Sequence, residues 1–553
     1  MKAYEAIAAA FVAEGVDTVF ALLGDGNMIM LADLVERHGV RLVNTRHENA
    51  AVAMADGWAR TANRVGVCSV TCGPGLTQVC TALTAAVRNR TPLVLFAGDL
   101  PAGAAWNPQN IDQGLAIAAT GAVSAPIRSL ETVGDTVRNA FLAAQRDRVP
   151  VVVSMPYDLQ ELELPGRFDY EPSQPLPALP QTPEPGPADV AAAAERLAAA
   201  ERPIIVAGRG AVAAGAREAI LALADRTGSL VGTTLLARDW FRGEPFDIGL
   251  VGGLSARTTR DLLGECDLVL AVGASLGYFT TDNGKLLAGI EVIQVDTEPK
   301  GVTEGVRAAT STVRGDARVT VTRIDAVLAE RGHHATGFRS DSVSQRLARP
   351  LPEYPVLTPE PGTVDPAAVI DALDSALPPE PLLVLGVGHF WSFAVMGMHR
   401  PAPADHLYAY GFGAVGHGLP TAIGAAVAAR RPVVLIEGDG SLLMHVGELA
   451  TVAAEGLDLL VVVMNDCGFG SEIHKLNAKG ANGELARFGQ VDFAAVAEGF
   501  GITGHRLASA GEVEGLLGEH LERGGPTLID VPMSRDALSA PTRRALFPHT
   551  LPD

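Results

Sequence analysis

The spacing of apolar positions is most regular in residues 433–470. Two short apolar runs, at 433–436 and 459–464, end in small and polar residues, and between them the apolar residues recur at helical spacing. This order predicts a strand, a crossover helix and a second strand. Because such crossovers pair parallel strands, the residues that follow the two runs, Asp439 and Asp466, are expected side by side at one edge of a sheet.

The same alternation of apolar runs and helical patterns covers most of the chain. The predicted strands ahead of this region begin at residues 18, 41, 66, 92, 149, 203, 268 and 291. Strands that alternate with helices are typical of α/β domains with parallel sheets. At 553 residues the chain is too long for one core, and two proline-rich stretches divide it. The predicted domains are 1–165, 188–340 and 363–535, with linkers at 166–187 and 341–362 and a tail at 536–553.

The composition argues against several classes of function. The formal charge is −20 and no concentrated run of Lys and Arg occurs, so no nucleic-acid partner is expected. No apolar stretch approaches the roughly 20 residues that span a bilayer, so no membrane association is expected. The five cysteines form no CxxC pair, which favours a reduced, cytoplasmic protein over a disulfide scaffold or a zinc site.

The turn at Gly438, Asp439 and Gly440 carries chemistry that suits a phosphate and a hard cation. Together with Asp466 it provides two carboxylates, which are oxygen ligands of the kind that Mg²⁺ prefers, and its glycines allow close approach to an oxyanion. An ordinary turn with a capping aspartate is the alternative. A Gly-Asp-Gly at residues 24–26 provides a comparison within the chain. The residue 27 positions after its aspartate is a valine, whereas the residue 27 positions after Asp439 is Asp466.

Gly-Asp-Gly, 24 further residues and then Asn-Asp resemble the thiamine diphosphate motif of enzymes related to acetolactate synthase, pyruvate decarboxylase and benzoylformate decarboxylase. The resemblance implies Mg²⁺ ligands at Asp439, Asp466 and the main-chain carbonyl of Gly468. The family has asparagine where this chain has Asp466, so the site keeps an oxygen ligand and gains a negative charge. Over the whole chain, the resemblance implies an α/β fold in which two parallel-sheet thiamine diphosphate-binding domains, for the pyrimidine and the diphosphate, flank a Rossmann-like middle domain.

The first domain contains a segment similar to the family's glutamate region, with Arg46, His47 and Glu48 shortly ahead of AAVAMADGWAR. The resemblance implies that Glu48 is the catalytic carboxyl that exchanges a proton with N1′ of the aminopyrimidine, which requires an apolar setting and a tuned pKa. A carboxylate that stabilises a helix N-terminus is the alternative. In the family this glutamate and the metal site belong to different subunits, so a homodimer or homotetramer with active sites at the subunit interface is expected.

Other cofactor contacts follow from the same resemblance. The segment YGFGAVGHGLP, residues 410–420, is similar to the family's glycine-rich piece, which implies that the Gly413 carbonyl receives the 4′-amino group and that Val415 bends the cofactor into its V shape. Gly388 and His389 fall where the family contacts the diphosphate. The remaining expected contacts are Gly438, Gly440, Ser441, Phe469 and Gly470. Close helix packing through glycines is an equally good interpretation of each single glycine.

The middle domain is expected to be structural. Gly208 and Gly210 follow its first predicted strand and resemble part of a dinucleotide fingerprint, but the third position is Ala213, which favours a tight turn. The arginine and phenylalanine segments that hold FAD in acetolactate synthases are not recognisable in GASLGYFTTDNG. No tightly held FAD is therefore expected.

The resemblance implies a C–C lyase or carboligase that depends on thiamine diphosphate and Mg²⁺ and acts on a small molecule, a 2-oxo acid or a 2-hydroxy ketone, by decarboxylation, carboligation or both. Asn27, Gln109 and His474 are the candidates for substrate or proton handling, and an ordinary polar loop residue is the alternative at each. A 2-hydroxyacyl-CoA lyase and a flavin-linked 2-oxo acid oxidase on the same scaffold are alternative enzymes. A thiamine-binding regulatory scaffold is the non-enzyme alternative, which the presence of Glu48 disfavours.

Overall fold

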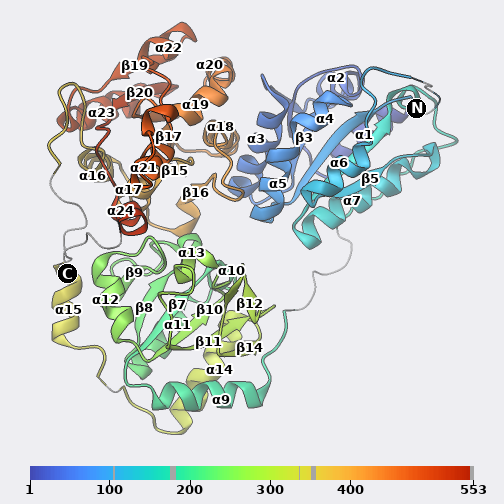
Figure 1. Cartoon of the computed structure of the whole chain (residues 1–553). Coiled ribbons are helices and arrows are strands. Elements are labelled where there is room, and N and C mark those ends of the chain that lie inside the picture. Colours follow the sequence, from blue (N-terminus) through green and yellow to red (C-terminus); the bar gives the residue numbers. More distant parts are fainter. Residues whose placement is uncertain (102, 104–105, 175–181, 336, 350–356, 548–553) are drawn as a thin grey trace. The chain divides into compact units, whose positions relative to one another are not determined.

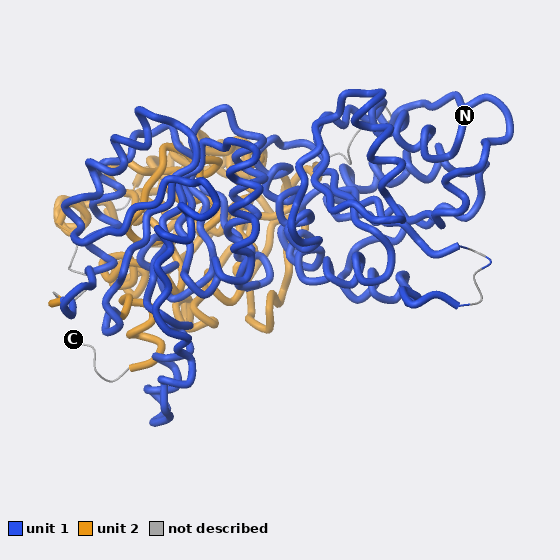
Figure 2. The backbone as a smooth tube through the Cα atoms, turned by 90° about the horizontal axis from the view of Figure 1, so that it is seen from above, with its two compact units in different colours: residues 1–179, 359–394, 406–537 blue, residues 180–358, 395–405, 538–553 orange. Residues whose placement is uncertain are grey.

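The chain forms two compact units (Figure 2). They are seen in a computed structural model that describes residues 1–553 apart from 102, 104–105, 175–181, 336, 350–356 and 548–553 (Figure 1). Unit 1 consists of residues 1–179, 359–394 and 406–537, and unit 2 of residues 180–358, 395–405 and 538–553. The predicted first and third domains therefore lie together in unit 1, while the predicted middle domain forms most of unit 2.

Unit 1 contains two parallel six-stranded sheets that share one strand order. The first sheet runs β2-β1-β3-β4-β6-β5, and the second runs β16-β15-β17-β18-β20-β19. When the strands are numbered within each sheet, both orders read 2-1-3-4-6-5, so the two halves of unit 1 repeat one fold. Helices α3 and α18 are equivalent in this repeat, because each follows the second strand of its half. The predicted pair of parallel-sheet α/β domains is confirmed.

In the first half the strands are β1 Thr18–Ala21, β2 Arg41–Asn44, β3 Gly66–Val70, β4 Leu93–Asp99, β5 Val123–Pro126 and β6 Pro150–Pro156. Its helices are α1 Ala3–Ala13, α2 Met28–Glu36, α3 Glu48–Ala62, α4 Pro74–Gln78, α5 Cys80–Asn89, α6 Gln113–Thr120, η1 Leu130–Thr132, α7 Val133–Asp147 and α8 Tyr157–Gln160.

In the second half the strands are β15 Leu382–Leu385, β16 His406–Tyr408, β17 Val433–Gly438, β18 Leu459–Asn465, β19 Thr503–Arg506 and β20 Thr527–Pro532. Its helices are α16 Pro366–Ala376, α17 Trp391–Gly397, α18 Gly418–Ala428, α19 Asp439–Met444, η4 Val446–Glu448, α20 Leu449–Glu455, α21 Gly470–Ala478, η5 Gly483–Ala486, α22 Phe493–Gly499, η6 Ala510–Glu512 and α23 Val513–Arg523.

The strands predicted at both ends of residues 433–470 are present as β17 and β18. They are parallel neighbours, and Gly438 pairs with Met464, so Asp439 and Asp466 follow adjacent strand ends. The crossover differs from the single predicted helix, because α19, the 3₁₀ turn η4 and α20 replace it. His445, at φ −132° and ψ 28°, lies outside the helical region and interrupts the hydrogen-bond ladder between α19 and η4.

The two halves of unit 1 meet where α3 packs against α18. The helices approach so closely that a Cβ at Gly57 would overlap the carbonyl of Thr421, and a Cβ at Gly424 would overlap the carbonyl of Met54. Leu419, Ile423 and other fully buried side chains surround this crossing in one continuous core. Glycine is required at both positions because the backbones themselves are in contact.

Unit 2 contains a third parallel sheet, in the order β14-β11-β10-β7-β8-β9, and the short antiparallel pair β12-β13. Its strands are β7 Pro203–Ala207, β8 Leu230–Thr233, β9 Asp247–Leu250, β10 Leu268–Val272, β11 Glu291–Asp296, β12 Val302–Thr303, β13 Val306–Arg307 and β14 Ser311–Arg314. Its helices are α9 Pro187–Ala199, α10 Arg209–Ala213, α11 Arg217–Thr227, η2 Leu235–Ala237, α12 Arg257–Glu265, α13 Tyr278–Thr281, α14 Ala317–Glu330, α15 Asp341–Ala348, η3 Pro403–Asp405 and α24 Ala540–Leu546.

The tight turn predicted after the first strand of unit 2 is present. The Gly208 N–H donates to the Val272 carbonyl, and the Gly210 N–H donates to the Gly273 carbonyl, both at 2.9 Å. A Cβ at Gly208 would overlap the Gly273 carbonyl. The two glycines therefore serve backbone packing between the β7 and β10 turns.

Two stretches predicted as linker and tail contain helices. Helix α15 lies within residues 341–362, and α24 lies in the tail, where an Arg544 guanidinium N–H donates to the Ser255 carbonyl at 3.0 Å. Both helices are short and lie among prolines, so the sequence pattern predicted a linker and a tail in place of helices. Among the described helices, none is long and apolar enough to cross a membrane.

The close crossing of α3 and α18 predicts that Gly424→Ala lowers the free energy of unfolding by about 1–3 kcal/mol, since the added methyl group must push the two helices apart. Gly518→Ala in α23 is the matched control, because a Cβ there meets no atom within 4 Å. It should stabilise the protein by about 0.5–1 kcal/mol. Urea denaturation of both variants measures the difference, and equal stabilities would contradict the packing described.

Candidate active site

Asp439 and Asp466 lie at the carboxyl ends of β17 and β18 in unit 1. Asp439 is the first residue of α19, and its Oδ2 accepts a hydrogen bond from the Gly468 N–H at 3.1 Å. Both aspartates are buried. A Cβ at position 470 would overlap Oδ2 of Asp466, so Gly470 makes room for this side chain. The structure thus brings together the three residues predicted as metal ligands.

Both buried carboxyls have a raised pKa. Burial, and after it the negative charge of Asp466, raises the pKa of Asp439 to about 8. Burial also raises the pKa of Asp466 to about 6, although the Gly468 N–H and Arg487 oppose the shift. A bound divalent cation would remove both penalties, because it attracts the ionised form of each carboxyl. No group of three or more His, Cys, Asp and Glu side chains that could hold a metal occurs in the described part of the chain.

His389 lies beside this pair. Its Nδ1 is 3.9 Å from Oδ2 of Asp466, and its ring centroid is 4.6 Å from that of His474. Burial and the neighbouring His474 lower the pKa of His389 to about 3, so the ring is neutral. Neither ring nitrogen has a hydrogen-bond partner among the described residues, and the buried Nε1 of Trp391 has none there either. Buried polar atoms are usually satisfied, so these three point to a ligand.

The glycine-rich segment lies next to the turn at residues 438–440. Ser441 Oγ accepts a hydrogen bond from the Gly416 N–H at 2.8 Å. Gly413 has φ +66°, which favours glycine, and no atom would lie within 4 Å of a Cβ there. Val415 is half-buried. The segment is therefore tied to the turn at one end and leaves open space at Gly413.

Glu48 begins α3, but another residue caps this helix. His47 is the N-cap, and its Nδ1 accepts a hydrogen bond from the Asn49 N–H at 3.0 Å. Glu48 is half-buried, and its carboxylate has no hydrogen-bond or ion-pair partner within the described ranges. The capping bond of α3 belongs to His47, and Glu48 is the acidic residue of its first turn, so the alternative of a carboxylate that stabilises the helix N-terminus stays open.

Asn49 joins the Glu48 turn to the glycine-rich segment of the same chain. Its Nδ2 is 2.9 Å from Nε2 of His417, and its Oδ1 accepts from the Ala82 N–H at 3.0 Å. Burial lowers the pKa of His417 to about 4, so this ring is also neutral. Next to this contact, a carboxylate oxygen of Glu448 accepts from the Arg46 N–H at 2.8 Å. No sequence pattern predicts these partners, because 368 residues separate Asn49 from His417 and no motif contains both.

The three residues predicted to handle substrate or protons lie in different settings. Asn27 is fully buried, where its Oδ1 accepts from the Gly24 N–H and its Nδ2 donates to the Leu22 carbonyl and Ser69 Oγ. These bonds fold the β1–α2 turn and use both polar ends of the side chain. Gln109 Oε1 accepts from Cys72 Sγ at 3.3 Å in the first half of unit 1. His474, next to His389, lies near the two aspartates.

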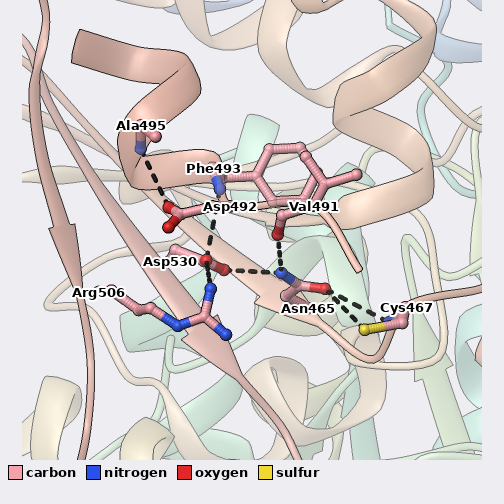
Figure 3. A network of polar contacts seen from close by, with 8 residues as sticks. All are labelled: Asn465, Cys467, Val491, Asp492, Phe493, Ala495, Arg506 and Asp530. Atoms are coloured by element: carbon pink, nitrogen blue, oxygen red, sulfur yellow. Dashed lines mark hydrogen bonds and ion pairs between the residues drawn. The ribbon is translucent and has the colours of Figure 1, made fainter. Parts of the chain in front are cut away.

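A buried polar network holds the loop that carries Asp466 (Figure 3). Asn465 Nδ2 donates to Asp530 Oδ1 at 2.9 Å and to the Val491 carbonyl at 3.0 Å, while its Oδ1 accepts from the Cys467 N–H at 3.3 Å. Arg506 donates to Asp530 Oδ2 at 2.9 Å. Cys467 is thereby held at φ +60°, a conformation that L residues rarely adopt. Asp530 and Arg506, which the sequence analysis also missed, support the loop through Asn465.

Comparison with known proteins identifies the chain. Models of the thiamine pyrophosphate enzyme family match its N-terminal TPP binding domain at residues 1–116, its central domain at 190–324 and its C-terminal TPP binding domain at 386–531. The chain belongs to the thiamine pyrophosphate enzyme family. The candidate active site lies in the C-terminal TPP binding domain, and Glu48 lies in the N-terminal one.

Curated relatives of this thiamine pyrophosphate enzyme cover nearly its whole length. A probable acetolactate synthase large subunit from Methanocaldococcus jannaschii is 30% identical over 550 residues, 96% of this chain and 92% of the relative. The acetolactate synthase large subunit of Parasynechococcus marenigrum is 31% identical over 94% of this chain and 86% of its own. A probable 2-ketoarginine decarboxylase from Pseudomonas aeruginosa is 32% identical over 94% and 91%. The chain is therefore a thiamine pyrophosphate-dependent enzyme that is similar to acetolactate synthases.

The residues present fit the cofactor of the family. Two buried carboxylates are stabilised by a bound cation or a retained proton, and the unpartnered ring nitrogens of His389, beside Asp466, are available to an anion or another polar ligand. Glycine at 438 and at 388 leaves room for the Phe390 ring, which a Cβ at either position would meet at 2.8 Å or less, so both glycines serve packing in the structure. The two carboxylates and the ring nitrogens of His389 suit a metal-bound diphosphate at the end of β17.

The raised pKa values predict that Mg²⁺ binding strengthens as the pH rises from 6 to 8. Protons compete with the metal for the carboxylates, and in the metal-free protein Asp439 loses its proton only near pH 8. For the same reason, the contribution of Asp439 to metal-free stability is present below its unfolded pKa and is lost as the pH rises towards 8. Calorimetric titration with MgCl₂ at several pH values measures the dependence.

Asp466→Asn is the matched control for this titration. It removes the neighbouring charge that raises the pKa of Asp439, so the rise in affinity should move to lower pH and fewer protons should be released at pH 7. If the wild type and the variant show the same pH dependence, the two carboxyls are not coupled as described.

Proposed function

We propose that this enzyme is a thiamine diphosphate- and Mg²⁺-dependent C–C lyase or carboligase that acts on a 2-oxo acid or a 2-hydroxy ketone. The observation that carries the proposal is the pair of buried carboxylates, Asp439 and Asp466, beside the unpartnered His389 in the C-terminal TPP binding domain. Such a pair is unfavourable without a cation, and Mg²⁺ is the cation that commonly bridges protein carboxylates to a diphosphate.

Within this proposal, Asp439, Asp466 and the Gly468 carbonyl would hold the metal. The residues that would hold the diphosphate are Gly388, His389, Gly438, Gly440, Ser441, Phe469 and Gly470. The neutral ring of His389 can donate one hydrogen bond to a phosphoryl oxygen without requiring a second negative group. Gly413 and Val415 hold the aminopyrimidine, which is supported by the open space at Gly413 and by the Gly416–Ser441 hydrogen bond.

Glu48 is proposed to hold and return a proton at the aminopyrimidine N1′. Its carboxylate is half-buried and has no partner in the described part of the chain, so it is free to bond a ligand nitrogen. His47 caps α3, and Asn49 binds His417, so the residues on both sides of Glu48 are fixed. When bound, thiamine diphosphate supplies a nucleophilic thiazolium carbon and an electron sink for the C–C bond that is made or broken.

The curated relatives support a 2-oxo acid as the donor. Two of them are named as acetolactate synthase large subunits, and one as a 2-ketoarginine decarboxylase, at similar identity. We propose decarboxylation of a 2-oxo acid as the first half of the reaction, followed either by protonation or by addition to a second carbonyl. His474, near His389, and Gln109 are the proposed polar residues of the substrate pocket. Asn27 is instead proposed to hold the β1–α2 turn, and no tightly held FAD is proposed.

Turnover of a 2-oxo acid panel tests the proposal. Metal-free and cofactor-free protein should release CO₂ from at least one of pyruvate, 2-oxobutyrate, benzoylformate and 2-ketoarginine only after Mg²⁺ and thiamine diphosphate are added. Glu48→Gln should lower kcat by about 10²–10⁴-fold, because it removes the proton-accepting group but keeps the size of the side chain.

Glu514→Gln is the matched control, since Glu514 is an acidic residue in the first turn of another helix, α23. It should leave turnover unchanged. If Glu48→Gln turns over like the wild type, Glu48 is not the proton acceptor, and if no thiamine diphosphate binds to the wild type, the proposed function is wrong.

The proposal includes a homodimer or homotetramer with active sites between subunits. Hybrid dimers with Glu48→Gln in one subunit and Asp439→Asn in the other test the source of Glu48. If each site takes Glu48 and Asp439 from different subunits, one of the two sites is intact, and the hybrid should retain about half of the wild-type activity. An inactive hybrid, with both single variants also inactive, would place Glu48 and Asp439 of one site in the same chain.

A further inference from the structure

Glu437 is a buried carboxylate that the proposed chemistry does not use. It is the last residue of β17 before the Gly-Asp-Gly turn, and none of its surface is exposed. No positively charged side chain pairs with it within the described ranges. A buried carboxylate is unfavourable unless its oxygens are hydrogen-bonded. The hydrogen-bond partners of Glu437 therefore indicate its structural role.

The partners of Glu437 lie on two separate parts of the candidate site. One oxygen, Oε1, accepts from the Gly438 N–H at 3.1 Å, in the turn that leads to Asp439. The other, Oε2, accepts from the Leu419 N–H at 3.2 Å, in the first turn of α18, within the glycine-rich segment. Each oxygen therefore faces a backbone donor on a different element.

Two glycines are packed against the same carboxylate. A Cβ at Gly418 would overlap Oε2, and a Cβ at Gly386, at the end of β15, would overlap Oε1. The absence of both side chains lets the carboxylate reach the backbone on either side. Ser441, whose side chain also hydrogen-bonds Glu437, accepts from the Gly416 N–H at 2.8 Å, so the same network reaches the glycine-rich segment at a second point.

We propose that Glu437 is a positioning residue that sets the spacing between the glycine-rich segment, residues 410–420, and the turn at residues 438–441. The inference rests on the proposed function, in which the first segment holds the aminopyrimidine and the turn holds the metal and the diphosphate. A cofactor that contacts both ends gains from their fixed spacing, because less freedom is lost on binding. A ligand that contacts only the diphosphate end does not depend on it.

Two ligands therefore distinguish the role of Glu437. Thiamine diphosphate with Mg²⁺ spans both segments, while inorganic pyrophosphate with Mg²⁺ reaches only the turn. In Glu437→Gln the single amide oxygen can accept from only one of the two backbone donors, and the NH₂ group faces the other. Calorimetric titration should give a Kd for thiamine diphosphate that rises about tenfold, and a Kd for pyrophosphate that rises less than about twofold.

Glu14→Gln is the matched control for the substitution. Glu14 also accepts from a backbone N–H, that of Ser173 at 2.7 Å, but it lies outside the proposed site. Both Kd values should be unchanged in this variant. If Glu437→Gln does not fold, as judged by its thermal transition, Gly418→Ala tests the same contact from the other side and should show the same selective loss.

The outcomes separate this inference from the proposed function. Wild-type protein that binds no thiamine diphosphate overturns the proposed function and the inference together. Wild-type protein that binds it, with variants that bind both ligands as well as the wild type or lose both equally, overturns the inference alone.

Discussion

Two buried carboxylates at the ends of adjacent parallel strands are the constraint on which the candidate site depends. The register of β17 and β18 places Asp439 and Asp466 at one sheet edge, and burial with like charge raises the pKa of Asp439 to about 8. Such an arrangement is stabilised only when a cation is bound or a proton is retained. An asparagine at position 466, which the family resemblance implies, would lack the second charge that raises the pKa of Asp439.

The surrounding residues fix the positions of Asp439 and Asp466 but do not neutralise their charges. Asn465, supported by Asp530, fixes the loop that contains Asp466, and Gly470 leaves room for the carboxylate. The closely packed helices α3 and α18 bring the Glu48 turn next to the glycine-rich segment. Because both halves of unit 1 repeat one strand order, equivalent helices meet at this crossing, and each contributes a glycine where the backbones touch.

Local sequence patterns predicted that Asp439 and Asp466 lie side by side, but they did not predict the residues that support this pair. The 27-residue step from Asp439 to Asp466 spans one crossover and one strand, which is enough to infer that the two lie side by side. The contact between Asn49 and His417 joins two domains, and Asn27 is hydrogen-bonded to Ser69 in another strand. The spacing of residues along the sequence predicts neither contact. The break at His445 and the helix α15 were missed because short helical turns leave little periodicity.

The dependence of cofactor binding on the metal tests the central claim most directly. Calorimetric titration of thiamine diphosphate into metal-free protein should show no binding, and the same titration with Mg²⁺ should show a saturable site that Asp439→Asn abolishes or strongly weakens. Binding of equal strength with and without Mg²⁺ would contradict the claim, because the diphosphate would then be held without a cation between it and the two aspartates.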